Sequence, residues 1–433
     1  MSEIVNIHDE EAQKLKRRND RLIRNMLNVS NKYLRRILEL QGAPQSLDYF
    51  INILKRIHVE NKGVKREKDI KTIGTYCVMV PQELIYAAGC IPVKLCSGSY
   101  TAYNLGDELA PRDSCPLVKS IIGFNAMKLM PVYDECSLIV VPTSCDCKKK
   151  MASVLTKYNK VLPLHIPTSK LEDESKDYYI KDIYTLKDML ESISSKKITY
   201  SRLKRAIEAL ACAQREVFRL YNLKKHNPPV IKGTHAITVM NSYSFDRVDR
   251  WAKALRILND ELTLRVESKR YVAKPNAPRI MITGSPIVFP NIKIPLLIEE
   301  MGGVFVADET CMGERGLYDP VAVTEDTLDG LMRAISVKAV LPCSCPSFVN
   351  NEQYIFKIKQ MIEDFKVQGV IYHVLRGCLV YDFEFFAIEE ALRNMDIPVI
   401  RVETDYNEED VEQIRIRIEA FVEMIKFRNV EDK

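Results

Sequence analysis

A chain of 433 residues is too long for one ordinary domain, since domains of roughly 150 residues predict two or three. Hydrophobic residues make up 46% and charged residues 28% of the chain, which predicts a packed globular protein and excludes a disordered one. The net charge of only +5 gives no support to binding of nucleic acid or of a membrane surface.

The chain begins with a polar segment, residues 1–70, that is expected to be helical. Apolar residues such as Leu34, Ile37 and Leu38 recur at helical spacing, and Lys and Arg fill the other faces. The simple interpretation is a solvated helical face, and docking to a partner is the alternative. The densely charged start predicts no signal peptide, and no apolar run is long enough to predict a transmembrane helix, so we expect a cytoplasmic protein.

Residues 71–170 change to short apolar strands that alternate with helices, which predicts a first α/β domain with a parallel sheet. Residues 171–277 form a predicted helical connection, and the α/β pattern returns in residues 278–433 as a second domain. The predicted fold is therefore α/β, with two similar doubly wound (flavodoxin-like) parallel-sheet domains, an N-terminal helical segment and the helical connection. The expected strands are Thr72–Val80, Ile91–Leu95, Leu138–Val141, Val161–His165, Arg279–Thr283, Val304–Ala307, Ala339–Leu341, Gly369–His373 and Val399–Val402.

The composition is unusual in its 12 Cys against 6 His. Disulfides are not expected in a reducing cytoplasm, so these thiols pack, react or bind metal. The two α/β halves carry three cysteines each in matching order, and each is expected just beyond a strand, where doubly wound sheets bind their ligands. They are Cys96, Cys115 and Cys145 in the first half, and Cys311, Cys345 and Cys378 in the second.

Two of these cysteines are each followed by a proline, Pro116 and Pro346, that suits the first turn of a helix. Cys115 and Cys345 are therefore expected near helix N-termini, whose partial positive charge stabilises a thiolate.

Six thiolates at strand ends, three from each half, predict a soft metal centre held between two lobes. Iron–sulfur clusters are bound by Cys thiolates, whereas structural zinc prefers four ligands, often in paired C-x2-4-C spacing. The close pairs in this chain are instead C-x-C, at Cys145/Cys147 and Cys343/Cys345. An iron–sulfur cluster is favoured, and zinc or purely structural thiols are the alternatives.

A set of motifs is spread over residues 70–425. These motifs are Gly74–Leu84 with Ala87-Ala88-Gly89 after it, Cys115–Ser120, Thr143–Met151, Gly369–His373 leading to Cys378, and Glu403–Tyr406. Together they resemble the 2-hydroxyacyl-CoA dehydratase and benzoyl-CoA reductase superfamily.

The resemblance implies that the three cysteines used by dehydratase subunits map to Cys115, Cys145 and Cys378. The chain has additional cysteines at Cys96, Cys311 and Cys343-Ser344-Cys345, and these resemble the double-cubane cluster protein branch. In that branch six Cys hold a double-cubane [8Fe-9S] cluster, which is two four-iron cubanes joined by a bridging sulfide. The repeat favours Cys345 over Cys343 as the ligand, while the resemblance does not choose between them. At Cys147 the family usually has Gly.

The resemblance also implies partners. We expect a homodimer, a separate ATP-hydrolysing iron–sulfur activator protein that supplies electrons at very low potential, and a small unsaturated substrate. The chain contains no P-loop and no G-x-G-x-x-G motif, so it is not itself expected to bind ATP. No nucleic acid or membrane partner is expected.

Other residues near the predicted ligands have weaker indications. His373, which ends a strand close to Cys378, is a candidate proton donor, and Arg376 is a candidate donor of a hydrogen bond to cluster sulfur. Cys77 is interpreted as a packing thiol, with metal ligation as the alternative. The run Lys148–Lys150 is either a solvated helix face or a means of neutralising a negative cluster.

Three functions follow. The first is an iron–sulfur reductase with a double-cubane cluster, which the six cysteines favour. The alternative within enzymes is a 2-hydroxyacyl-CoA dehydratase or benzoyl-CoA reductase subunit with a single [4Fe-4S] cluster. The alternative of another class is a non-catalytic electron carrier or metal-stabilised scaffold.

Overall fold

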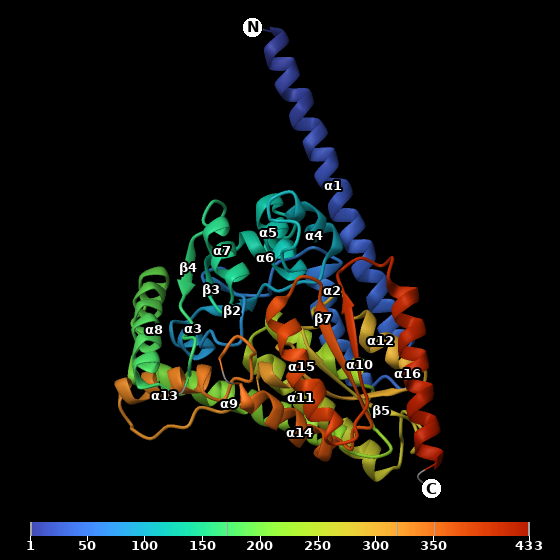
Figure 1. Cartoon of the computed structure of the whole chain (residues 1–433). Helices are drawn as coiled ribbons and strands as arrows, with labels where there is room; N and C mark the ends of the chain where they lie inside the picture. Colours follow the sequence, from blue (N-terminus) through green and yellow to red (C-terminus); the bar gives the residue numbers. More distant parts are fainter. Residues whose placement is uncertain (1, 171, 318, 350, 432–433) are drawn as a thin grey trace.

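The computed structural model describes residues 2–170, 172–317, 319–349 and 351–431. Within these residues the strands form two four-stranded sheets, and all neighbouring strands are parallel (Figure 1). The first sheet has the order β2-β1-β3-β4, and the second has the order β6-β5-β7-β8. The strands are β1 (Thr72–Thr75), β2 (Ile91–Lys94), β3 (Cys136–Pro142), β4 (Val161–Leu164), β5 (Arg279–Gly284), β6 (Val304–Glu309), β7 (Gly369–Leu375) and β8 (Val399–Thr404).

The two sheets repeat one topology, because in each the second strand lies outside the first and the third and fourth follow on the other side. This order is that of flavodoxin-like doubly wound sheets, whose ligands bind beyond the carboxyl ends of the strands where the strand order reverses. The predicted fold class is therefore confirmed, with two similar α/β sheets, N-terminal helices and a helical connection.

The helices of the first half cover its sheet and lead away from its strand ends. Helix α5 is buried along nearly its whole length, and Gly106 and Gly123 allow α4 and α5 to pack backbone to backbone. These helices are α3 (Gln82–Ala87), α4 (Tyr100–Asp107), α5 (Pro116–Met127), α6 (Pro131–Asp134) and α7 (Asp146–Leu155).

The helical connection packs against both halves. Helix α9 contacts α3 of the first half, while Gly233 at the start of α10 lies directly against the Phe305 carbonyl of β6. Trp251 is fully buried among these helices, so the connection belongs to the main core. Its helices are α8 (Asp173–Ser194), α9 (Tyr200–Lys224), α10 (Gly233–Ser242) and α11 (Val248–Glu267), with a short turn η2 (Tyr243–Phe245).

The second half corrects one expected strand. Residues Ala339–Leu341 do not form a strand, because Ala339 and Val340 end helix α13 and bury its apolar face. A short apolar run does not distinguish a strand from a buried helix end. The helices of this half are α12 (Lys293–Glu300), η3 (Glu314–Gly316), α13 (Leu328–Val340), α14 (Glu352–Phe365), α15 (Leu379–Arg393) and α16 (Val411–Glu431).

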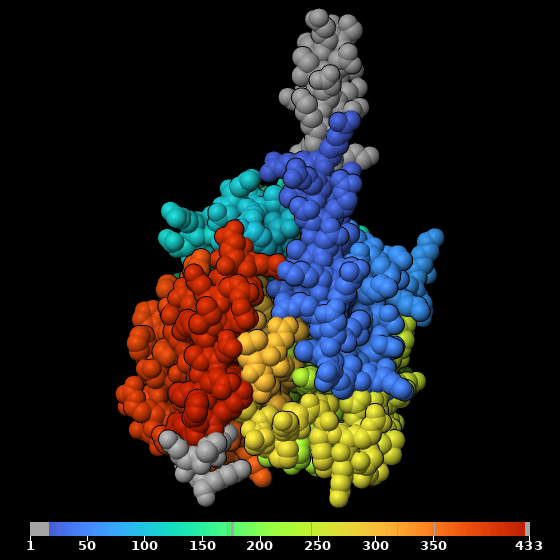
Figure 2. Space-filling view, turned by 90° about the vertical axis from the view of Figure 1, so that its right-hand side faces the viewer, coloured from blue at the N-terminus to red at the C-terminus, as the bar shows by residue number. Residues whose placement is uncertain are grey.

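The N-terminal segment forms α1 (Ser2–Glu39), the short turn η1 (Gln45–Leu47) and α2 (Asp48–His58). Figure 2 shows this segment in blue along one face, with the gold region of α12 between it and the red C-terminal region. Arg36 of α1 pairs with Glu300 of α12 at 2.8 Å, and α12 packs on α16. No helix among the described residues is long and apolar enough to cross a membrane.

Candidate metal centre

The ends of the two sheets come together where the strand-end loops of each half meet. The Lys94 Nζ atom at the end of β2 donates a hydrogen bond to the Cys311 carbonyl beyond β6, at 2.6 Å. Ser97 Oγ donates to the Phe289 carbonyl at 3.2 Å, which joins the same two halves a few residues away. A narrow gap between the halves is lined by Cys77 of the first and Cys311 of the second. Thiols from both halves therefore face one region.

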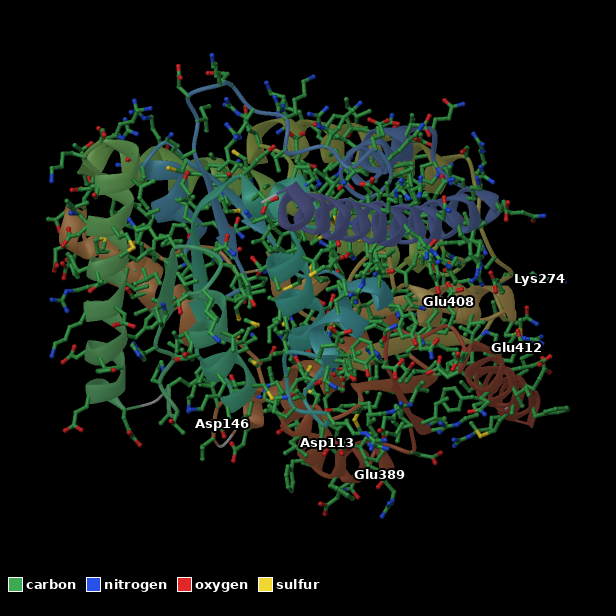
Figure 3. All side chains as sticks on the ribbon, turned by 90° about the horizontal axis from the view of Figure 1, so that it is seen from above. Asp113, Asp146, Lys274, Glu389, Glu408 and Glu412 are labelled. Carbon is green, nitrogen blue, oxygen red and sulfur yellow. The ribbon has the colours of Figure 1, made fainter. Side chains whose placement is uncertain are left out.

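Three thiols stand at helix N-termini, and we call them the cap set: Cys115, Cys145 and Cys378. They are the N-cap residues of α5, α7 and α15. Cys115 and Cys378 form a hydrogen-bonded pair across the two halves. Cys145 in turn lies close enough to Cys378 for the two thiolates to repel each other. Figure 3 labels the exposed Asp113 and Asp146, close in sequence to Cys115 and Cys145, at the same edge of the molecule.

The cap set is held largely by backbone N–H groups. The hydrogen bond from Cys115 lowers the pKa of Cys378, and the Tyr381 N–H and the Ser285 hydroxyl lower it further. For Cys145 burial raises the pKa, and the charge and the backbone N–H of Lys148 oppose this increase. Free N–H groups and the partial positive charge at a helix N-terminus stabilise a thiolate.

The other three predicted ligands form what we call the loop set: Cys96, Cys311 and Cys345. Burial raises the pKa of Cys96 to about 11, with Cys311 among the neighbouring thiols that add to the increase. Burial also raises the pKa of Cys345 to about 11, and Cys311 again adds to it. For Cys311 burial is outweighed by the cations of Arg315, Lys94 and Lys148, so its pKa is lowered.

The placement of Cys345 differs from the sequence prediction. It follows helix α13 rather than a strand, and α14 begins only at Glu352, so Pro346 starts no helix. Its sulfur instead accepts a hydrogen bond from Ser347 Oγ at 3.2 Å. Each set takes thiols from both halves, so the cap set consists of the three cysteines that the resemblance maps to dehydratase subunits and not of the three cysteines of one half.

Lys148 lies between the two sets. Burial alone would lower the pKa of this ammonium, but the thiolates of Cys77, Cys145, Cys345 and Cys96 outweigh it, so the net pKa is raised. Its neighbours Lys149 and Lys150 are exposed. Of the two interpretations of this run, charge neutralisation fits Lys148, and a solvated face fits the other two.

Arg315 is a site residue that no sequence pattern indicates. Its Nη1 atom donates to Cys311 Sγ at 3.6 Å and to the Tyr381 hydroxyl at 2.8 Å. Its guanidinium forms a buried ion pair with Glu309 at the end of β6, with Nε to Oε1 at 2.8 Å. Ser344 Oγ also donates to Glu309, which ties the Cys345 loop to the same network.

A second buried network supports the loop that follows β6. Asp308 accepts hydrogen bonds from Lys224 Nζ at 3.0 Å, the Tyr221 hydroxyl at 2.9 Å and the Glu314 N–H at 3.0 Å. A Cβ at Gly313 would lie 1.3 Å from Asp308 Oδ1, so only glycine fits there. Asp308 thus joins α9 to the loop after β6, and these hydrogen bonds hold the chain from Cys311 to Arg315 in place.

The structure does not bring the two remaining predicted residues into contact with the thiols. His373 is buried, its Nδ1 lies 2.9 Å from the Ser285 carbonyl, and burial lowers its pKa to about 4. The Arg376 side chain is 60% exposed and pairs with Asp405 at 3.0 Å. Their roles as proton donor and sulfur donor stay predictions.

Two further thiols accompany the loop set. Cys77 lies beyond β1, and it contributes to the electrostatics of Cys96, Cys345 and Cys343. Cys343 is buried beside Cys345. The loop set thus has two buried neighbours of the same chemistry, and geometry alone does not select its three ligands. Cys90 and Cys136 pack away from the centre, and Cys212 is partly exposed on α9 beside Arg215.

The chemistry of this donor set fits a sulfur-rich cluster. The groups that meet are soft thiols, and the buried charges that face them, Lys148 and Arg315, are cations that balance thiolates. Among the described residues no three His, Cys, Asp or Glu side chains are close enough to share a single metal ion.

Paired flavodoxin-like sheets with thiols from both at their facing ends define a class of two-lobed, cysteine-rich proteins. The model of one family, 2-hydroxyglutaryl-CoA dehydratase, D-component, matches residues 77–425. The chain belongs to this family of dehydratase and reductase subunits.

Several relatives are similar over most of their length. The "Putative dehydratase subunit YjiM" of Escherichia coli (strain K12) is 34% identical over 366 residues, 83% of this chain and 93% of that protein. The (R)-phenyllactyl-CoA dehydratase beta subunit of Clostridium sporogenes is 26% identical over 377 residues, 85% of this chain and 94% of that protein. A benzoyl-CoA reductase subunit of Thauera aromatica is 23% identical over 365 residues, 82% of this chain and 91% of that protein.

Proposed function

We propose that this protein is an iron–sulfur reductase that holds a double-cubane [8Fe-9S] cluster between its two α/β halves. It accepts low-potential electrons from a separate ATP-hydrolysing activator protein in the cytoplasm and reduces a small unsaturated substrate. The observation that supports the proposal is that thiols of both halves meet at the facing sheet ends, three of them at helix N-termini and the others, Cys96, Cys311 and Cys345 with Cys77 and Cys343 beside them, in loops.

Each set has the size expected for one cubane of the pair. The cap set would hold one cubane through Cys115, Cys145 and Cys378. The loop set would hold the other through Cys96, Cys311 and Cys345. When bound, the cluster would supply electrons at very low potential.

The protein's own residues would then bind and neutralise this centre. Helix N-termini present backbone N–H groups to the cap set, while Arg315 and Ser347 donate to sulfurs of the loop set. The Lys148 ammonium lies near thiols of both sets, so its positive charge would offset the negative charge of the sulfide that bridges the two cubanes. Hydrogen bonds and positive charge near cluster sulfur raise the reduction potential of the cluster. These side chains would therefore tune that potential.

A second candidate is a dehydratase or reductase subunit, as several relatives are named, and it would hold a single [4Fe-4S] cluster. The observation in its favour is that the cap set alone has the hydrogen-bonded thiol pair, Cys115 with Cys378. In that case the loop set would be structural thiols. A non-catalytic electron carrier or a zinc-stabilised scaffold is the remaining alternative.

Metal and acid-labile sulfide analysis of anaerobically purified protein tests these proposals. About eight irons per chain supports the double cubane, about four supports the single cluster, and zinc alone supports the scaffold. Cys345→Ser should lower the iron content far more than Cys212→Ser, because Cys212 lies on α9 away from both sets. Equal iron in these two variants would contradict the role of Cys345.

The electron supply has its own test. Relatives such as the (R)-phenyllactyl-CoA dehydratase beta subunit are by name parts of multi-subunit enzymes, which supports work with a partner protein; the homodimer stays a prediction from the resemblance. Full reduction should need the activator together with ATP hydrolysis. Complete reduction by a mild chemical donor alone would rule out a very low potential and with it the need for an activator.

A further inference from the structure

A pocket of about 390 Å³ lies beside Arg315. Cys343 and Ser344, beside the loop set, form one part of its wall, and α13 and α14 form another. Arg315 lines the pocket and also donates to Cys311 Sγ, so this one side chain links the pocket to a thiol of the loop set. A molecule bound here would lie next to the centre that supplies its electrons.

The cations of the pocket are already paired. Arg315 pairs with Glu309, Lys338 with Glu83 at 3.2 Å, and Lys357 with Glu314 at 3.0 Å. A phosphate or carboxylate ligand needs cations that can turn toward it, and these cations would have to leave carboxylates to do so. Asp319 adds a further acid to the wall. The pocket therefore suits a small molecule without negative charge.

Glu314 differs from the other acids of this pocket. It is 3% exposed, and its Oε1 accepts from Lys357. Its Oε2 atom is fully buried and has no hydrogen-bond partner among the described residues. A buried carboxylate oxygen without a donor is costly, whereas a protonated carboxyl group can turn its O–H toward a bound ligand.

The surroundings of Glu314 favour the protonated form. Asp308 and Glu309 of β6 are the nearest acids, and the Tyr221 hydroxyl of α9 also lies close. Lys357 of α14 and the adjacent Arg315 are the facing cations, but Arg315 is committed to Glu309. Burial raises the pKa of Glu314 to about 7, with Lys357 opposing the increase.

We propose that this pocket binds the small, uncharged, unsaturated substrate and that the Glu314 carboxyl group is its proton donor. The inference rests on the proposed reductase function. Reduction of one C=C bond takes up two electrons from the bound cluster and two protons. Each proton leaves the Glu314 O–H, and water reprotonates the carboxylate on the side of Lys357, whose side chain is 25% exposed.

The first experiment follows the carboxyl group itself. Infrared difference titration of the purified holoprotein should show the C=O stretch of a buried carboxylic acid that disappears with a midpoint near pH 7 and is missing in Glu314→Gln. Lys357→Met removes the cation that opposes protonation of Glu314, so it should move that midpoint to higher pH. Glu299→Gln, which removes a buried carboxyl on α12, should leave the band unchanged. If wild type and Glu314→Gln show the same bands, Glu314 is an ordinary ionised carboxylate and the proposal fails.

The second experiment uses three probes with the same C=C bond: crotonamide, crotonate and crotonyl-CoA. With a low-potential donor, crotonamide should be reduced fastest, its rate should fall as the pH rises through about 7, and Lys357→Met should move that fall upward. Glu314→Gln should lose about 100-fold in kcat with unchanged iron content and electron uptake. Faster reduction of either anionic probe, no reduction of any probe by a protein that takes up electrons, or an unchanged rate in Glu314→Gln would overturn the proposal. A protein without iron would instead refute the reductase function, and the infrared titration would still report on Glu314.

Discussion

In the cap set, Cys115, Cys145 and Cys378 each precede an α-helix, whereas in the loop set Cys96, Cys311 and Cys345 stand at no helix N-terminus. Backbone N–H groups, which no substitution except proline removes, serve the first set together with the Ser285 hydroxyl. Side chains serve the second, through Arg315, Ser347 and Lys94. The thiols of the two sets are thus stabilised in two ways within one protein. Single side-chain substitutions should disturb the loop set more than the cap set.

The largest effect is expected from removing the cation that serves the loop set. Arg315→Met leaves Glu309 buried without its partner; the two side chains are 3% and 1% exposed. Breaking a buried pair from one side costs about 3–5 kcal/mol. The unfolding free energy from chemical denaturation should fall by that amount.

A matched control uses an arginine with an exposed partner. Arg333→Met removes an ion pair to Asp329 whose side chains are 57% and 55% exposed. Such pairs contribute about 0.2–1 kcal/mol, so the change should be small. Similar losses in Arg315→Met and Arg333→Met would mean that the network around Arg315 does not hold the loop set in place.

The next effect concerns acid stability on the cap-set side. Burial lowers the pKa of His373 from 6.5 to about 4, with Lys293 and Asp410 facing it, so the unfolded chain binds a proton in that interval that the folded protein does not. Stability contributed by the neutral imidazole is complete above pH 6.5 and is lost as the pH falls toward 4, by up to about 3 kcal/mol. His373→Asn should therefore show a shallower loss of unfolding free energy across this window. An acid limb identical to that of wild type would contradict the buried, neutral state.

A smaller effect is expected from the glycine that joins the cap set across the halves. Gly377 has a φ of +72°, and a Cβ there would lie 2.5 Å from the Asp113 carbonyl. Gly377→Ala should cost about 1–3 kcal/mol, because it forces both a left-handed alanine and a backbone shift. Hydrogen exchange should rise in residues 113–118 and 377–382 together. If exchange rose in only one of these segments, the two halves would not depend on this contact.

The smallest effect tests a single donor of the loop set. Ser347→Ala removes the hydroxyl that donates to Cys345 Sγ at 3.2 Å. A hydrogen bond of this kind contributes about 1 kcal/mol, so the midpoint of denaturation should move slightly while iron content stays near that of wild type. A large loss of iron would show that Ser347, and not only Cys345, is needed to hold the metal.

The sheets could be predicted from the sequence because their strands are short, apolar and regularly separated. Ile91–Leu95 and Gly369–His373 agree with β2 and β7 to within two residues. The strand expected at Ala339–Leu341 failed, since alanine, valine and leucine also suit the buried end of a helix, and here α13 takes them. A run of only three apolar residues is too short for its length or its flanking residues to distinguish a strand from a helix end.

The candidate site could be predicted only in so far as the order of the cysteines along the chain indicates it. The repeat located six cysteines that the fold brings to one region but grouped them three to a half, whereas the cap set, Cys115, Cys145 and Cys378, was indicated only by the resemblance to dehydratase subunits. The proline after Cys345 predicted a helix N-terminus there, although the chain runs on to Asn351 before α14. Arg315 and Glu314 went unnoticed because their importance comes from burial beside Glu309 and Asp308, which a single exposed-looking Glu-Arg-Gly stretch does not indicate.

Because each set takes thiols from both halves, the order of synthesis matters. Cys145 leaves the ribosome roughly 230 residues before Cys378, and at about 5–20 residues per second this delay is on the order of 10–50 s. During that interval the first half presents its thiols without the partners that complete either set. Metal delivered early would meet incomplete ligand sets, so insertion of the proposed cluster would follow the end of translation, when the last strands have joined the second sheet.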